Sequence, residues 1–170
     1  RVALSLCYFK VYVVGSSMSS TLSGAPDKSR EGGEYVYAFK SDHPRRGDIV
    51  IVKTEKKTLI KRVVALGGDT VEIKEGVLYL NGIVKDEPYV DAENNTPSKN
   101  NFAKIKVPEG CMFCLGDNRD VSIDSRSDEY GCMPVEWTAG IVADWSMSCK
   151  GAITAFNTFF DFTLPNTFRH

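Results

Sequence analysis

The sequence predicts a mostly β protein, and three observations lead to this fold class. Short runs of β-branched residues recur along the chain, glycine-containing turn signals separate several of them, and no heptad repeat or convincing long amphipathic helix is evident. The chain has 170 residues, of which 42% are hydrophobic and 25% are charged, as in ordinary soluble globular proteins. We therefore expect a single domain over residues 1–170.

Turn signals arrange the predicted strands into a meander of hairpins. Glu75-Gly76 and Asn81-Gly82 stand on either side of a short apolar run and are typical of tight hairpin turns. Residues 91–101 are too polar for a strand and predict a flexible loop, within a small loop-rich insertion at 82–106. Strands are expected at residues 48–53, 58–66, 70–74, 77–80 and 112–115.

The two ends of the chain are less specific in pattern. Residues 1–14 are mostly apolar, and we interpret them as a first strand that begins just after a membrane anchor outside this sequence. No stretch reaches the ~20 apolar residues that a membrane helix requires. The C-terminal stretch fits either a strand or a short helix, and its aromatic residues are Phe156, Phe159, Phe160 and Phe162.

Charge and cysteine content argue against two functional classes. With 21 basic and 22 acidic residues the net charge is −1, and no long block of one sign offers a surface for nucleic acid. The chain has five cysteines, an odd number that cannot form a complete disulfide framework. Cys111 and Cys114 lack a second pair of ligands at zinc spacing, and a strand would point them to opposite faces. We interpret them as core residues and expect no metal site.

A serine-rich turn is the first candidate for chemistry. Gly15-Ser-Ser-Met-Ser-Ser-Thr-Leu22 follows an apolar strand. Such a turn can expose a hydroxyl and aim backbone N–H groups outward, as a nucleophile with an oxyanion hole requires, although similar clusters also occur in ordinary solvated loops. A Ser-His-Asp triad is poorly supported, because no Gly-x-Ser-x-Gly elbow is present and His43 lies in a loop-like segment.

An unusual lysine is the candidate base. In the predicted strand at 58–66, side-chain alternation gives two apolar faces, with Lys61 on one and Arg62 on the other. Burial disfavours an ammonium ion and lowers the lysine pKa from its ordinary ~10.4, so that the neutral amine can accept a proton from a serine. The alternative is an edge strand whose two cations reach solvent along their long stems.

The segment Gly116-Asp-Asn-Arg-Asp-Val-Ser-Ile-Asp-Ser-Arg126 alternates acids, bases and hydroxyls densely. As a calcium loop it places arginines where acidic or amide ligands belong and lacks the required glycine. A solvated charged loop is another interpretation. We favour a buried polar network beside a site, in which Asp124 pairs with Arg126 and Ser122 orients a lysine amine.

Taken in order, these segments resemble bacterial type I signal peptidases, of the compact Gram-positive-like type. The serine turn is similar to the family's Ser-Met-x-Pro-Thr-Leu box, with Ser20 in place of the proline. Gly116 to Arg126 matches the most distinctive box with essentially no departures. The other similar segments are Arg46-Gly-Asp-Ile-Val50, Lys61-Arg62 and Gly67-Gly-Asp69.

The resemblance implies a serine endopeptidase that removes N-terminal signal peptides from exported preproteins after small residues, commonly Ala-x-Ala. It implies Ser17 as the nucleophile, whose backbone N–H also donates to the oxyanion, and Lys61 as the general base and later the acid. Gly15 stands where some relatives carry a second hydroxyl donor. The supporting residues that the resemblance implies are Ser122, Asp124, Arg126 and Gly15.

The resemblance also implies coiled antiparallel sheets, an apolar surface that faces the bilayer, and a catalytic domain on the extracytoplasmic face of the cell membrane. The implied partners are secretory preproteins and the membrane lipid surface, without nucleic acid, metal or organic cofactor. Two alternatives remain open. One is a self-cleaving repressor-type Ser–Lys peptidase, although no Ala-Gly precedes Ser17. The other is a catalytically silent β domain that binds exported peptides.

Overall fold

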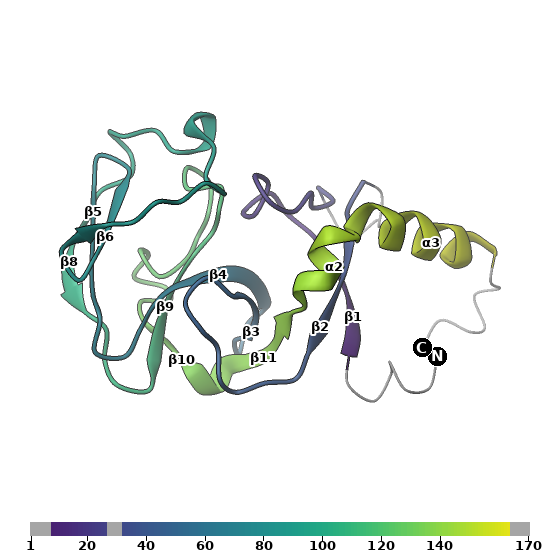
Figure 1. Cartoon of the computed structure of the whole chain (residues 1–170), viewed down its shortest axis with the longest axis horizontal. Coiled ribbons are helices and arrows are strands. Elements are labelled where there is room, and N and C mark those ends of the chain that lie inside the picture. Colours follow the sequence, from purple (N-terminus) through teal and green to yellow (C-terminus); the bar gives the residue numbers. More distant parts are fainter. Residues whose placement is uncertain (1–7, 27–31, 164–170) are drawn as a thin grey trace.

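The computed structural model describes residues 8–26 and 32–163, which form two antiparallel sheets and a helical C-terminal segment (Figure 1). The larger sheet contains Tyr8–Tyr12 (β1), Tyr35–Phe39 (β2), Ile49–Lys53 (β3), Thr58–Leu66 (β4), Cys111–Leu115 (β9), Met133–Pro134 (β10) and Thr138–Val142 (β11). The smaller sheet contains Thr70–Lys74 (β5), Val77–Leu80 (β6), Ile83–Val84 (β7) and Phe102–Lys106 (β8). The orders are β1-β2-β11-β3-β4-β9-β10 and β7-β6-β5-β8. The prediction of a mostly β protein with antiparallel sheets is confirmed.

The hairpins of the smaller sheet form where the turn signals predicted them. Glu75-Gly76 joins β5 to β6 with φ values of 49° and 80°, and Asn81-Gly82 joins β6 to β7 with 54° and 79°. Positive φ at both central residues matches the right-handed twist of the flanking strands, which is why Asn-Gly and similar pairs favour this turn. The expected strands at 48–53, 58–66, 70–74, 77–80 and 112–115 correspond to β3, β4, β5, β6 and β9.

The two sheets share one apolar core. A register shift between Val63 and Ala65 interrupts the alternation of β4, and Val64 and Ala65 both pack into this core. Strict alternation, which would place these two side chains on opposite faces, therefore ends at the shift. The other strand residues of the cluster come from β9, β5 and β6: Phe113, Leu115, Val71, Ile73, Leu78 and Leu80.

The C-terminal segment is helical, which settles the choice between strand and helix. Asp144–Ser148 (α2) and Lys150–Thr163 (α3) follow β11, and α3 is longer than the short helix expected. Its polar side chains anchor it on β2, because Thr154 Oγ1 accepts a hydrogen bond of 2.8 Å from the N–H of Tyr35. Packing on β2 thus selects a helix from a sequence that is ambiguous by itself. In the described part of the chain, the helices are too short or too polar to cross a bilayer.

Two further sequence predictions concern the N-terminal strand and the segment at 82–106. Of the first strand expected within 1–14, residues 8–12 form β1, and residues 1–7 lie outside the described residues. Residues 82–106, expected as a loop-rich insertion, contain β7, a short 3₁₀ helix at Ala92–Asn94 and β8. Because β8 pairs with β5, this segment belongs to the smaller sheet. We call residues 70–106 the small lobe.

Candidate active site

The serine turn is fixed by backbone hydrogen bonds and by two buried side chains. Gly15 has a φ of 83°, and its N–H donates to Ala25 O at 2.7 Å. Met18 and Leu22 are buried against the larger sheet, and the N–H of Leu22 donates to Met18 O at 2.7 Å. Apolar anchors therefore hold the turn on the sheet and leave the side chain of Ser17, one residue before Met18, at its edge.

Lys61 lies in the middle of β4 and reaches Ser17. Its Nζ forms hydrogen bonds of 2.7 Å with Ser17 Oγ and 3.1 Å with the carbonyl oxygen of Ile60. The residue is 3% exposed. Burial lowers the pKa of Lys61 from 10.5 to about 8, and the charge of Asp124 opposes this shift. The structure thus brings together the two residues that the sequence singled out as nucleophile and base.

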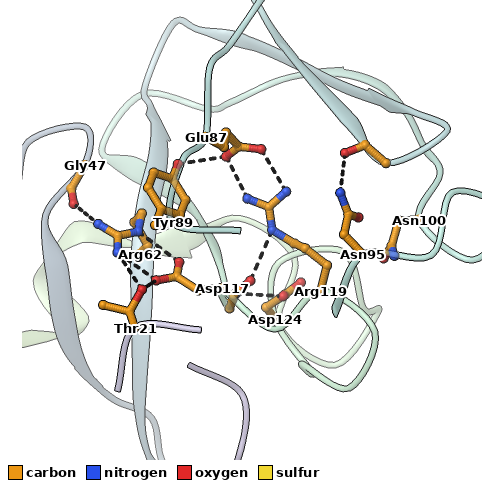
Figure 2. A network of polar contacts seen from close by, with 12 residues as sticks. Thr21, Gly47, Arg62, Glu87, Tyr89, Asn95, Asn100, Asp117, Arg119 and Asp124 are labelled. Atoms are coloured by element: carbon orange, nitrogen blue, oxygen red, sulfur yellow. Dashed lines mark hydrogen bonds and ion pairs between the residues drawn. The ribbon is translucent and has the colours of Figure 1, made fainter. Parts of the chain in front are cut away.

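Arg62 points to the opposite face of β4, as alternation requires. Its Nε and Nη2 donate to the two carboxylate oxygens of Asp117 at 2.9 and 2.7 Å, and Nη1 donates to Gly47 O at 2.8 Å. The guanidinium also lies 3.9 Å from the centre of the Tyr89 ring, as Figure 2 shows. It is therefore paired inside the protein and does not extend into solvent.

The 116–126 loop contains the ion pair expected between Asp124 and Arg126, with Nε and Oδ1 2.9 Å apart. The Asp124 side chain is fully buried, and its Oδ2 accepts a hydrogen bond of 3.0 Å from the N–H of Gly116. Arg126 also donates to Asn100 in the small lobe. The loop is thus a buried polar network and not a solvated charged loop.

Ser122 is close to the site, but the hydrogen bond expected between it and Lys61 is not formed. Its Oγ is buried and has no hydrogen-bond partner among the described residues. It lies against Gly116, where an added Cβ would clash with Ser122 Oγ and Ser17 O. The absence of a side chain at Gly116 therefore lets the loop, Ser122 and the serine turn approach one another.

A groove of about 500 Å³ opens beside Ser17 and Lys61. Two chain segments line its length, at residues 11–15 and 56–61, together with Met18. On β4 the pairing with β9 begins only at Arg62, so that residues 58–61 have β3 as a partner on one side and the groove on the other. The groove therefore presents a strand edge next to the serine hydroxyl.

Sequence reasoning missed several residues that hold this site. Asn100, in the stretch expected to be a flexible loop, is 2% exposed and donates to Asp120. Glu87 and Tyr89 of the small lobe contact two arginines next to the site. The sequence feature that could have singled out Glu87 and Tyr89 is their position on either side of Pro88, as an acidic and an aromatic residue in an otherwise polar stretch.

Cys111 and Cys114 pack in or against the apolar core, as expected. Cys114 is buried in the core on one side of β9, and Cys111 packs against the core shared by the two sheets. The described cysteines, Cys111, Cys114, Cys132 and Cys149, are all free thiols. Within residues 8–26 and 32–163, no group of three or more His, Cys, Asp or Glu side chains is placed to hold a metal ion.

Comparison with known proteins places this β fold in the class of S26 peptidases. The model of the family described as "Signal peptidase, peptidase S26" matches residues 2–145. The chain belongs to the signal peptidase family. The resemblance drawn from the sequence boxes is therefore confirmed at the level of the family.

Individual relatives agree with the family assignment. A "Signal peptidase I" of Bacillus licheniformis is 38% identical over 133 residues, which cover 70% of this chain and 67% of the relative. A "Signal peptidase I" of Bacillus caldolyticus is 34% identical over 155 residues, covering 82% and 80%. A crystal structure of a signal peptidase I from Enterococcus faecalis V583 superimposes with a TM-score of 0.51 at 31% identity, covering 59% of this chain and 97% of that one. With several other Bacillus relatives the matched share of their length is 48% to 66%.

Proposed function

We propose that this chain is the catalytic domain of a type I signal peptidase, a serine endopeptidase that removes signal peptides from secretory preproteins. The observation that carries the proposal is the 2.7 Å contact between Lys61 Nζ and Ser17 Oγ, with Lys61 buried beside a groove. An acidic or histidine base is not needed in this arrangement. Burial supplies the neutral amine that the chemistry requires.

The proposed reaction begins when Lys61 Nζ takes the Ser17 proton as Ser17 Oγ bonds to the scissile carbonyl carbon. With a pKa of about 8, roughly one Lys61 in ten is neutral at pH 7, against one in a few thousand at the ordinary lysine pKa. The tetrahedral oxyanion accepts a hydrogen bond from the N–H of Ser17, which donates to no other group in the described part of the chain.

The intermediate then collapses, the C–N bond breaks, and Lys61 gives its proton to the leaving amine. An acyl-enzyme ester remains on Ser17. Lys61, neutral again, takes a proton from a water molecule that attacks the ester, and Ser17 recovers its proton as the acid product leaves. The same amine thus acts as base and acid in each half of the reaction.

The groove supports an extended peptide as the substrate. The strand edge at residues 58–61 can pair with such a peptide through backbone hydrogen bonds, as in β-strand addition. Because side chains alternate along a strand, the residues at −1 and −3 from the scissile bond point the same way. Facing the groove wall next to Met18, both positions suit small residues, as in Ala-x-Ala.

Exposed apolar side chains near the groove support a membrane lipid surface as the second partner, on the extracytoplasmic face. Val14, which lines the groove, is 44% exposed, and Val121 and Ile123 of the 116–126 loop are 55% and 52% exposed. Apolar side chains of this kind can enter the interfacial region of a bilayer. If the chain fails to co-sediment with lipid vesicles, this contact is wrong.

The test of the function is cleavage of a preprotein with an Ala-x-Ala site, measured by mass spectrometry of the products. Ser17→Ala and Lys61→Met should each lower kcat by a factor of roughly 10³ or more. The matched controls are Ser16→Ala, on the exposed neighbour in the same turn, and Lys53→Met, on an exposed lysine of β3. Both should stay within twofold of wild type.

The same assay measures the dependence on pH. Below pH 8, kcat/KM should rise about tenfold per pH unit as Lys61 loses its proton, and it should level off above pH 8. A flat profile, or near-normal turnover in Lys61→Met, would show that Lys61 is not the base. Tight peptide binding without any cleavage by the wild-type protein would instead identify a silent peptide-binding domain.

A further inference from the structure

We propose that Glu87 and Tyr89 of the small lobe are positioning residues, which hold the serine turn and Lys61 in register through Arg119 and Arg62. The proposal rests on the proposed function of Ser17 and Lys61. Neither Glu87 nor Tyr89 lines the groove, so they act through other residues and do not touch substrate.

Glu87 forms a buried, two-pronged ion pair with Arg119. The Nη1 and Nη2 atoms of Arg119 donate to the two Glu87 carboxylate oxygens at 2.9 and 2.6 Å. The two side chains are only 1% and 9% exposed. Burying a guanidinium without a paired carboxylate is strongly unfavourable, so Glu87 determines the position of the Arg119 side chain.

Tyr89 connects this pair to β4. Its hydroxyl donates to Glu87 Oε1 at 2.8 Å, and Arg62 Cζ lies over its ring, 3.9 Å from the ring centre. Figure 2 shows Tyr89 between Glu87 and Arg62. Burial, reinforced by the Glu87 charge, raises the pKa of Tyr89 well above its ordinary value. The phenol therefore remains a donor at every pH at which Lys61 is expected to work.

Both arginine side chains form hydrogen bonds with residues next to the serine turn. Arg119 Nε donates to Gly116 O at 3.1 Å, and Arg62 holds Asp117 with two hydrogen bonds. The next residue, Asn118, donates its N–H to Ser17 O at 3.0 Å. Arg62 is also the direct neighbour of Lys61 on β4. Glu87 and Tyr89 are thus connected to the nucleophile by one route and to the base by the other.

A third contact joins the small lobe directly to the serine turn. Asn94 Nδ2 donates to Ser20 Oγ at 3.2 Å, at the position where the family box has a proline. A proline there has no hydroxyl to accept this bond. In this chain the turn therefore gains a contact with the same loop that carries Glu87 and Tyr89.

The first test compares kcat and KM for preprotein cleavage, with Leu78→Ala as the control for stability. Glu87→Gln and Tyr89→Leu should lower kcat by roughly 10- to 100-fold, because small displacements of reacting groups have effects of this size. KM should change less than twofold. Tyr89→Phe, which keeps the ring over Arg62 but loses the hydrogen bond to Glu87, should have a kcat between those of Tyr89→Leu and wild type. Leu78→Ala, in the core of the small lobe, should lower Tm at least as much as Glu87→Gln and Tyr89→Leu do. Its kcat should nevertheless stay at the wild-type value when the assay is run well below its Tm.

The second test does not depend on catalysis. Hydrogen exchange of the Asn118 amide reports on its bond to Ser17 O, and its protection should fall at least tenfold in Glu87→Gln but stay unchanged in Leu78→Ala. Unchanged Asn118 protection in Glu87→Gln, or kcat within twofold of wild type in both Glu87→Gln and Tyr89→Leu, would overturn the proposal. If the wild-type protein cleaves no preprotein, the proposed function fails, whereas the exchange measurement still decides whether Glu87 holds the serine turn.

Discussion

Both sheets are antiparallel, but they bury different kinds of side chain. In the four-stranded sheet, the buried strand residues are apolar, for example Val71 and Leu78. The larger sheet buries Lys61 and Arg62 in β4, next to a loop that buries charged residues of both signs. The buried charged residues of that loop are Asp117, Arg119 and Asp124.

This difference separates a scaffold from a site. Buried charges are costly unless each is paired, so a protein keeps them where they determine geometry or chemistry. Arg62, Arg119 and Arg126 each have a carboxylate partner, whereas Lys61 has a serine hydroxyl and a carbonyl oxygen. Of these cations, Lys61 is the one left without a directly bonded carboxylate. It is also the one whose proton must leave in the proposed reaction.

The largest expected difference between the two regions is the effect of a glycine-to-alanine substitution, which adds one methyl group. In Gly116→Ala the new Cβ meets Ser122 Oγ and Ser17 O at distances that force a displacement. We expect roughly a 100-fold or greater loss of kcat/KM for preprotein cleavage. In Gly82→Ala nothing lies within 4 Å of the new Cβ, and the positive φ costs about 1 kcal/mol. That variant should lower Tm by a few degrees and keep its activity. Equal activities of the two variants would refute the contrast.

The second contrast compares a buried lysine with an exposed one. Burial lowers the pKa of Lys61 from 10.5 to about 8, so the unfolded chain binds more protons than the folded chain between these pH values. Stability therefore rises with pH across this window, and below pH 8 the charged Lys61 destabilises the fold by about 3 kcal/mol. Lys61→Met should raise the free energy of unfolding by this amount at pH 6, with a gain that vanishes near pH 10.5.

Urea unfolding at a series of pH values measures this gain. The control is Lys74→Met on β5, where the side chain is 60% exposed, and it should give no pH-dependent change of similar size. If Lys61→Met is no more stable than wild type at pH 6, burial does not lower the pKa of Lys61. A positive result would mean that the proposed base is maintained at the expense of stability.

Local patterns in the sequence predicted the elements that local interactions determine. The Asn81-Gly82 pair requires positive φ at both positions, and so the hairpin follows from the residues themselves. Alternation on β4 separated Lys61 from Arg62 because the register shift comes only after Val63. The pairing of Asp124 with Arg126 was also predictable, since the two residues are only two positions apart.

Long-range polar contacts were not predictable in the same way. Residues 91–101 were predicted to be a flexible loop from their polarity, but Thr96 and Asn100 are fixed by hydrogen bonds to Asp120 in the 116–126 loop. Glu87 pairs with Arg119, which is 32 residues away in the sequence, and no local pattern predicts a partner at that separation. The helix α3 was ambiguous because its form depends on packing against β2. Partners far apart in sequence thus determine the features that were missed.

The smallest expected contrast concerns Asp69, at the junction between the two sheets. Burial alone would raise its pKa, but hydrogen bonds from Arg46, the N–H of Leu66 and Asn81 outweigh burial and lower the pKa to about 2. Because the folded-state pKa lies below the ordinary value of 3.8, the stabilisation is present above pH 4 and is lost as the pH falls towards 2. It amounts to at most about 2 kcal/mol, since Arg46 is 52% exposed and salt screens the pair.

Asp69→Asn should therefore lower the free energy of unfolding by about 1–2 kcal/mol near pH 7 and by nearly nothing at pH 2. Urea unfolding between pH 2 and 7 measures the difference, with Asp42→Asn as a control at an exposed carboxylate between β2 and β3. A difference between wild type and Asp69→Asn that is independent of pH would mean that the charge of Asp69 does not stabilise the junction between the two sheets. A difference that shrinks in high salt would confirm that the two sheets are joined by a partly solvated ion pair, unlike the largely buried pairs around Ser17.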